Sequence, residues 1–166
     1  MWEAYSEREA QAICREVRQS GDFAGFAQGF MHSDDSRVAR NALWVLTKAT
    51  DSELSQLQPL LDKLMDLAMH TDSSAVRRLS LNLVERLKMD EDDLRTDFLD
   101  FCLDHMADIA ELPGVQSISM KLAFRMCGFY PELMDEFRRT LEAMEISYYK
   151  PAVKCVRNKI LAGKMK

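Results

Sequence analysis

The chain has 166 residues, which is long enough for one ordinary domain with a buried core. Apolar residues make up 47% of the chain and charged residues 30%, a composition that excludes intrinsic disorder. The formal net charge of −5 argues against a protein that coats nucleic acid over its whole surface.

Turn-forming residues are few, since the chain has only six Gly and four Pro, and the sequence therefore predicts an all-α fold of long helices. A first helix is predicted over Glu7–Gln19 and a short second one around 23–30. We interpret the irregular segment 1–34 as N-terminal capping helices, because a terminal repeat has to cover an otherwise exposed end. Repeats are expected over 35–163, within a single domain that spans the whole chain.

Three further helices are predicted between the repeated segments described below. One runs from about Ser52 to Met69, and Pro59 inside it predicts a kink because proline removes a backbone hydrogen bond. The next runs from about Glu91 to Glu111, with Asp90 as its N-cap. The third covers about Pro131–Glu145.

Four segments share one apolar pattern, and they begin near Asp35, Asp72, Pro113 and Tyr149. Aligning Val38, Val76, Val115 and Ala152 gives steps of 38, 39 and 37 residues by subtraction. Small or aliphatic residues follow four and eight positions after each anchor, on the same helical face. These are Ala42, Leu46, Ser80, Val84, Ser119, Ala123, Val156 and Ile160. Asp35 and Asp72 are the expected N-caps of their helices, and Pro113 and Pro151 fit a first helical turn.

The unit length and the pattern Asp35…Val38…Arg40 and Asp72…Val76-Arg77-Arg78 resemble the HEAT/armadillo superfamily of α-helical repeats. The resemblance covers roughly residues 35–162. It implies a right-handed α–α superhelix of about four helix pairs, with eight to nine helices. In that superfamily the second helix of each pair, called B here, lines the concave surface, and the first helix, called A, forms the back.

The two sets of helices carry opposite charge. The four predicted B helices hold thirteen Lys and Arg against three acidic residues, whereas the predicted A helices are rich in Asp and Glu. Positions two, six and ten residues after each anchor share one face, and most of them are basic or polar. The candidate ligand-binding residues on this face, called the ladder here, are Arg40, Trp44, Lys48, Arg78, Asn82, Arg86, Lys121, Arg125, Lys154 and Asn158.

A basic concave ladder suits an acidic peptide, a phosphate backbone or an anionic cofactor. The alternative is that these charges are only the solvated face of each helix, with part of the asymmetry serving ion pairs between helices. Trp44 has the same two interpretations, as a stacking platform in the ladder or as a packed core residue.

Catalytic and metal-binding motifs are weak. The stripe Cys102, His105 and Asp108 could in principle hold a metal, but two of its members adjoin the apolar face. The sequence has no Gly-rich phosphate loop, no HExxH and no GxSxG motif. We therefore predict no catalytic residues, no metal and no cofactor.

The four Cys are far apart and form no CxxC pair, which favours reduced thiols. The charged segment Met1–Arg8 lacks the apolar core of a signal peptide, and no apolar run reaches the ~18–20 residues that span a bilayer. The sequence therefore predicts a cytoplasmic protein without a membrane partner.

The leading hypothesis is a non-enzymatic interaction module that holds an acidic protein segment along the ladder. The alternative is a DNA-binding or DNA-repair protein, since one branch of the superfamily comprises HEAT-like alkylpurine DNA glycosylases. In that branch a basic concave face holds duplex DNA, and aromatic residues with an Asp act at the lesion. Here only Trp44 lies on the ladder, and no Asp points into it, so nucleic acid is the second choice of partner.

Overall fold

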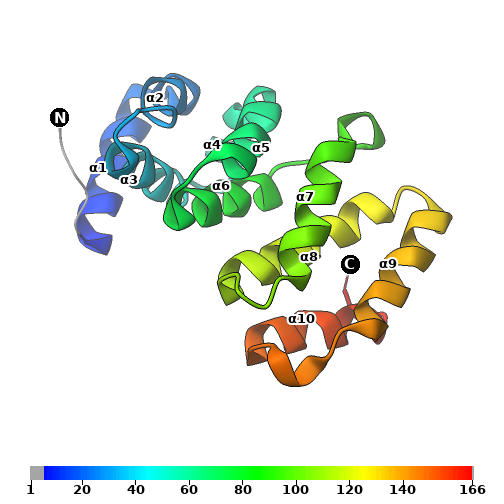
Figure 1. The fold of residues 1–166 in the computed structure, drawn as a ribbon. Helices are drawn as coiled ribbons and strands as arrows, with labels where there is room; N and C mark the ends of the chain where they lie inside the picture. Colours follow the sequence, from blue (N-terminus) through cyan, green and yellow to red (C-terminus); the bar gives the residue numbers. More distant parts are fainter. Residues whose placement is uncertain (1–5, 166) are drawn as a thin grey trace. The chain divides into compact units, whose positions relative to one another are not determined.

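A computed structural model describes residues 6–165, and the expectation about a signal peptide therefore falls partly on residues outside this range. The described part is helical and contains no strand (Figure 1). Its α-helices are α1 (Glu7–Ser20), α2 (Phe23–Phe30), α3 (Ser36–Leu46), α4 (Asp51–Leu54), α5 (Leu61–His70), α6 (Ser74–Arg86), α7 (Thr96–Ala107), α8 (Pro113–Cys127), α9 (Pro131–Ala143) and α10 (Pro151–Leu161). Three short 3₁₀ helices are η1 (Ser55–Leu60), η2 (Glu91–Asp93) and η3 (Ile146–Tyr148).

The chain forms two compact units, Met1–Lys88 and Met89–Lys166. The first unit contains α1 to α6, and the second contains η2 and α7 to α10. That the units act as the single domain expected from the sequence stays a prediction. Counting α4, η1 and α5 as one interrupted helix, the described residues form nine helices, within the predicted eight to nine.

The helix starts follow the capping residues in the sequence. The Asp35 side chain accepts a hydrogen bond from the Arg37 N–H, so Asp35 caps α3 as predicted. The prediction for α6 was wrong by one residue, because the Ser73 hydroxyl, rather than Asp72, accepts the Val76 N–H at 3.3 Å. Ser and Asp satisfy orphan N–H groups about equally well, so the sequence alone did not separate these neighbours.

Two predicted helices are interrupted. The expected kink at Pro59 is a 3₁₀ turn, η1, between α4 and α5, as the missing proline N–H requires. The helix expected to start at Glu91 starts five residues later, at Thr96. The Asp90 N–H donates to Asp93 Oδ2 at 2.8 Å, which closes a separate acidic turn. Asp side chains compete with the helical backbone in this way.

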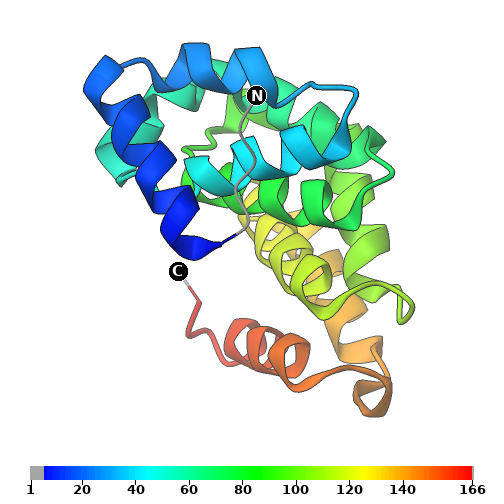
Figure 2. The same ribbon diagram turned by 90° about the vertical axis from the view of Figure 1, so that its left-hand side faces the viewer.

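Within each unit the helices pair as the repeat predicts. The A and B helices α5 and α6 pack together, as do α7 and α8 (Figures 1 and 2). B helices also pack on B helices, α3 on α6 in the first unit and α8 on α10 in the second. Each B helix therefore contacts both its own A helix and the neighbouring B helix.

The predicted stripe is the core of these contacts. Eight of its nine positions in α3, α6 and α8 are at most 2% exposed. Val38 is only half-buried, because it lies in the first turn of α3. In α10 the predicted anchor was wrong: Ala152 is exposed and Val153 is buried, since the helix begins at Pro151 and turns Val153, Val156 and Ile160 inward.

Ser119 is one of the small, fully buried residues of this stripe. Its side chain is completely buried on α8, and within residues 6–165 its hydroxyl has no hydrogen-bond partner. Replacing Ser119 with Leu should lower the free energy of unfolding by about 1–3 kcal/mol, because the extra carbons overfill a close helix contact. Urea denaturation followed by circular dichroism measures this change.

The matched control is Ser119→Ala, which removes the unpaired hydroxyl without adding volume. This variant should be as stable as the parent or slightly more so, because an unsatisfied buried polar group is lost. An unchanged denaturation midpoint for Ser119→Leu would show that α8 does not pack in this register.

Candidate functional site

A groove of about 290 Å³ runs between the two B helices of the first unit, α3 and α6. We call it the α3–α6 groove. It is lined by Trp44, Thr47, Lys48, Arg78, Leu79, Asn82, Glu85 and Arg86. Five of these eight residues belong to the predicted ladder, so the packing of α3 on α6 brings together residues that lie about one repeat apart in sequence.

Trp44 and Asn82 occupy equivalent positions on the two helices, six residues after their anchors. Both side chains are partly exposed, and both line the groove. Trp44 is neither fully buried nor fully exposed, so part of the indole is available in the groove that it lines with Leu79. An indole in this position offers an apolar wall and one N–H donor.

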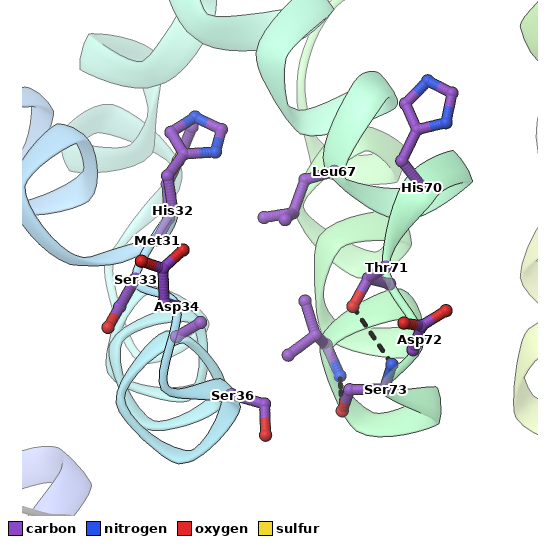
Figure 3. Close-up of a pocket in the computed structure, with 12 residues that line it drawn as sticks. Met31, His32, Ser33, Asp34, Ser36, Leu67, His70, Thr71, Asp72 and Ser73 are labelled. Atoms are coloured by element: carbon purple, nitrogen blue, oxygen red, sulfur yellow. Dashed lines mark hydrogen bonds between the residues drawn. The ribbon is translucent and has the colours of Figure 1, made fainter.

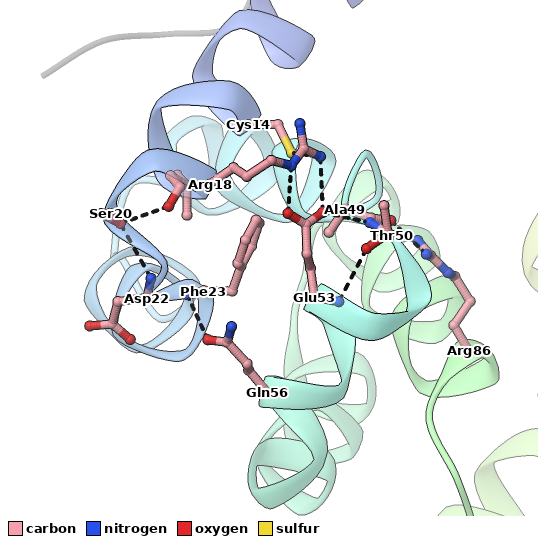
Figure 4. Close-up of polar contacts among 11 residues, drawn as sticks. Cys14, Arg18, Ser20, Asp22, Phe23, Ala49, Thr50, Glu53, Gln56 and Arg86 are labelled. Atoms are coloured by element: carbon pink, nitrogen blue, oxygen red, sulfur yellow. Dashed lines mark hydrogen bonds and ion pairs between the residues drawn. The ribbon is translucent and has the colours of Figure 1, made fainter.

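Arg86 lines the groove, but its guanidinium is committed to the backbone. It donates to the carbonyl oxygens of Thr47 at 3.0 Å and of Ala49 at 2.7 Å, and it pairs with Asp51 at 3.0 Å. Figure 4 shows Arg86 reaching the turn that connects α3 to α4. These carbonyls follow the C-terminal end of α3, where four backbone acceptors lack helical partners. Arg86 therefore fixes the end of the groove.

Lys48 is also paired. Its Nζ lies 2.6 Å from Glu7 Oε1, and only 24% of the lysine side chain is exposed. The carboxylate of Glu7, which is 57% exposed, stands at the start of α1. Two of the three groove cations thus have acidic partners, which lowers the positive potential that the sequence alone suggests.

Arg78 differs from these two residues. Its side chain is exposed on α6, and within residues 6–165 it forms no hydrogen bond or ion pair. Arg40, one turn before Trp44, does not line the groove, and its guanidinium donates to Asn41 Oδ1 at 3.2 and 3.3 Å. Arg78 is consequently the groove cation best placed to meet an external anion.

The remaining ladder residues belong to the second unit. Lys121 and Arg125 lie one turn apart on α8, half-buried, and each interacts with another residue. On α10, Lys154 is half-buried, and Asn158 Oδ1 accepts a hydrogen bond from Arg157 at 3.2 Å. The ladder thus has one group of residues in each unit, and a continuous surface across both units stays a prediction.

Several other basic residues of the B helices are structural. Arg77 donates to the carbonyls of Ala68 and Thr71, at 2.9 and 2.6 Å, and thereby closes the end of α5. Arg157 donates to the Leu141 carbonyl at 2.7 Å, near the end of α9. Sequence analysis counted both only among the thirteen basic residues of the B helices. Each of these arginines directly follows a buried valine, Val76 or Val156, and this was the only local signal of a structural role.

The start of α4 carries a second polar network, which sequence analysis missed (Figure 4). Glu53 and Thr50 form a capping box, in which the Thr50 N–H donates to Glu53 at 2.9 Å. The Arg18 guanidinium forms two further bonds to Glu53, one of them from Nη2 at 2.9 Å. The capping box is readable as Thr-x-x-Glu, but the partner on α1, 35 residues away, is not.

These contacts determine the ionisation of Glu53. Hydrogen bonding from Arg18, and then from the Thr50 N–H, lowers the pKa of Glu53 from 4.5 to about 2. Because the pKa is lower in the folded chain, the contact stabilises the fold above pH 4.5, and this contribution is lost as the pH falls from about 4.5 to about 2.

A larger cavity of about 470 Å³ lies at one edge of the first unit, where α3 and α6 begin (Figure 3). His32 and His70 come from opposite sides of it, and Asp34 and Asp72 lie below them. The N-termini of α3 and α6 would attract an anion, but the carboxylates of Asp34 and Asp72 repel it. Among the described residues, no group of three or more His, Cys, Asp or Glu side chains could hold a metal ion.

The three side chains considered for a metal, those of Cys102, His105 and Asp108, are engaged in other ways. Cys102 is fully buried, and burial raises the pKa of its thiol well above the usual range. His105 Nδ1 lies 2.7 Å from Glu111 Oε2, and Asp108 accepts the Ala110 N–H at 2.9 Å. Each side chain thus has a local structural role. None of the helices in the described residues combines the length and apolar character needed to cross a bilayer.

The different roles of Arg86 and Arg78 can be separated by substitution. Arg86→Ala should lower the free energy of unfolding by about 1–3 kcal/mol, because it leaves the Thr47 and Ala49 carbonyls without their donor. Arg78→Ala, two turns earlier on the same face of α6 and exposed, should leave stability nearly unchanged. Thermal unfolding of both variants measures the difference, and equal stabilities would contradict the structural role of Arg86.

The Glu53 contact predicts a specific pH dependence. Glu53→Gln should melt at a lower temperature than the parent at pH 7, and the difference should shrink as the pH falls from about 4.5 towards 2, where the parent carboxylate is protonated. Glu16→Gln, at an exposed position of α1, is the control and should melt like the parent at each pH. A difference that is constant with pH would show that the charge of Glu53 is not what stabilises the contact.

Comparison with known protein families supports the repeat fold. The family described as HEAT repeat domain matches residues 1–164, which is nearly the whole chain. Searches of curated proteins and of solved structures found no match. The family match agrees with the helix pairs and the B-to-B packing described above. The chain is a member of the HEAT repeat domain family.

Proposed function

We propose that this protein is a non-enzymatic interaction module that binds an acidic protein segment in the α3–α6 groove. HEAT repeats generally mediate protein interactions, so the family supports a scaffold role. The observation that carries the finer proposal is Arg78, an exposed cation without a partner in the described residues, beside a partly exposed Trp44.

The groove suits a short peptide rather than an isolated anion. Its lining mixes one available guanidinium with an aromatic wall, the amide of Asn82 and the aliphatic Leu79. A carboxylate could pair with Arg78, a backbone group could bond to Asn82, and an apolar side chain could pack on Trp44. Lys48 and Arg86 would support the groove electrostatically while they keep their own acidic partners.

Duplex DNA fits this groove less well. A DNA-binding protein usually neutralises several phosphates with separate cations. Here Lys48 and Arg86 are already paired, and Glu85 adds a negative charge to the lining. The second-unit residues Lys121, Arg125, Lys154 and Asn158 belong to the proposal only as a continuation of the ladder. A cytoplasmic location also belongs to it, supported by the four free cysteines.

The test is a binding titration with two probes at several salt concentrations. A fluorescein-labelled peptide of alternating Glu and Leu represents the acidic segment, and a labelled duplex of about 20 base pairs represents DNA. The parent should bind the peptide, and Arg78→Glu should weaken this binding by roughly tenfold or more, because attraction becomes repulsion. Folding should be unaffected, since the side chain is exposed.

Arg139→Glu is the matched control, because it makes the same charge change at an exposed position of α9, outside the ladder. It should bind the peptide like the parent. Equal binding by the parent and Arg78→Glu would contradict the groove as the site. Tighter binding of DNA, with log K falling by about 0.9 per phosphate for each unit of log salt, would favour the DNA-binding alternative instead.

A further inference from the structure

Exposed apolar side chains gather on two loops of the second unit. Five large apolar residues are exposed among the described residues, and four of them lie on these loops. Ile109 is 63% and Leu112 49% exposed between α7 and α8, while Ile146 is 37% and Tyr148 68% exposed between α9 and α10. Isolated exposed apolar residues are ordinary, but a cluster of this kind marks an interaction surface.

The two loops are joined into one edge. The Tyr149 hydroxyl donates to the Ala107 carbonyl at 2.7 Å, which ties the second loop to the end of α7. Gln116 Nε2 donates to the Asp108 carbonyl at 2.6 Å and holds the first loop on α8. In Figures 1 and 2 both loops lie on the same side of this unit. The apolar residues are therefore presented by a fixed backbone, which limits the entropy lost on binding.

The exposed charged residues close in sequence to these apolar side chains are mostly acidic. The exposed charged residues on the two loops and in the last turns of the helices that lead into them are Asp104, Asp108, Glu142, Glu145 and Lys150. Four of these five are negative. The pKa of the Tyr149 phenol is raised, first by burial and then by the negative charge of Asp108. A ligand for this edge therefore needs positive charge beside its apolar groups.

We propose that this edge docks a partner protein segment in which apolar side chains are flanked by Lys or Arg. Ile109, Leu112, Ile146 and Tyr148 would take the apolar side chains, and Asp108 and Glu145 would meet the flanking cations. A second copy of this chain fits less well, since the same acidic rim would face itself in a symmetric pair. This edge is made of other residues than the α3–α6 groove. It prefers a basic ligand, whereas the groove prefers an acidic one.

The experiment uses the full chain and a labelled peptide of alternating Leu and Lys blocks that forms a basic amphipathic helix. Fluorescence anisotropy should show binding, and the double variant Ile109→Ser/Tyr148→Ser should weaken it by roughly tenfold or more. Tyr130→Ser is the matched control. Tyr130 is 40% exposed at the N-cap of α9, between α8 and α9, and its removal should leave the affinity within about twofold.

A charge reversal separates docking from general attraction to an acidic protein. Asp108→Lys/Glu145→Lys should lose the basic peptide and gain a matched peptide of Leu and Glu, whereas Glu132→Lys on α9 should do neither. Unchanged binding by the serine variant, or equal binding of both peptides by the parent, would overturn the proposal. Sedimentation showing a dimer of the parent that the serine variant abolishes would do so too, because a second copy would then cover the edge.

Discussion

The close packing of each B helix against two neighbours is the constraint on which the rest of this structure depends. In α8, Ser119 and Ala123 lie completely buried at contacts with other helices, and Ala42 and Ser80 do the same on α3 and α6. Small side chains at these positions let the helix axes approach, and the larger Leu and Met residues fill the space around them. A B helix packed in this way retains only one narrow polar face.

That narrow face, together with the helix ends, explains why some basic residues of the B helices are structural and others remain exposed. A helix that ends inside a packed layer leaves carbonyl groups without partners, and water reaches them poorly. Arg77, Arg86 and Arg157 reach such carbonyls from the adjacent helix, with distances between 2.6 and 3.0 Å. Arginine suits this task because its planar fork can serve two acceptors at once. Many of the cations on B helices are therefore part of the fold.

The two proposed binding surfaces lie in different units and differ in chemistry. In the first unit, the α3–α6 groove combines Trp44 and Asn82 with the available guanidinium of Arg78. In the second unit, Ile109 and Tyr148 stand among acidic side chains on the loops that precede α8 and α10. Both surfaces arise from the repeat itself, one where neighbouring B helices meet and the other where A helices turn into B helices. A scaffold with two such surfaces could hold two segments of opposite charge.

The sequence by itself determined the helical repeat, because an apolar residue every three or four positions with a step of 37 to 39 residues leaves few other ways to bury a core. It also placed Trp44 on the ladder face of its helix, and Arg78 and Asn82 on the ladder face of theirs, since these positions follow from helical geometry alone. Local competition between caps was harder to read, as the starts of α6 and α7 show. Only the tertiary structure decided which cations are available. The pairing of Lys48 with Glu7, and of Arg86 with carbonyls beyond α3, depends on groups that lie about 35 to 40 residues away in sequence and that meet only when the helices pack.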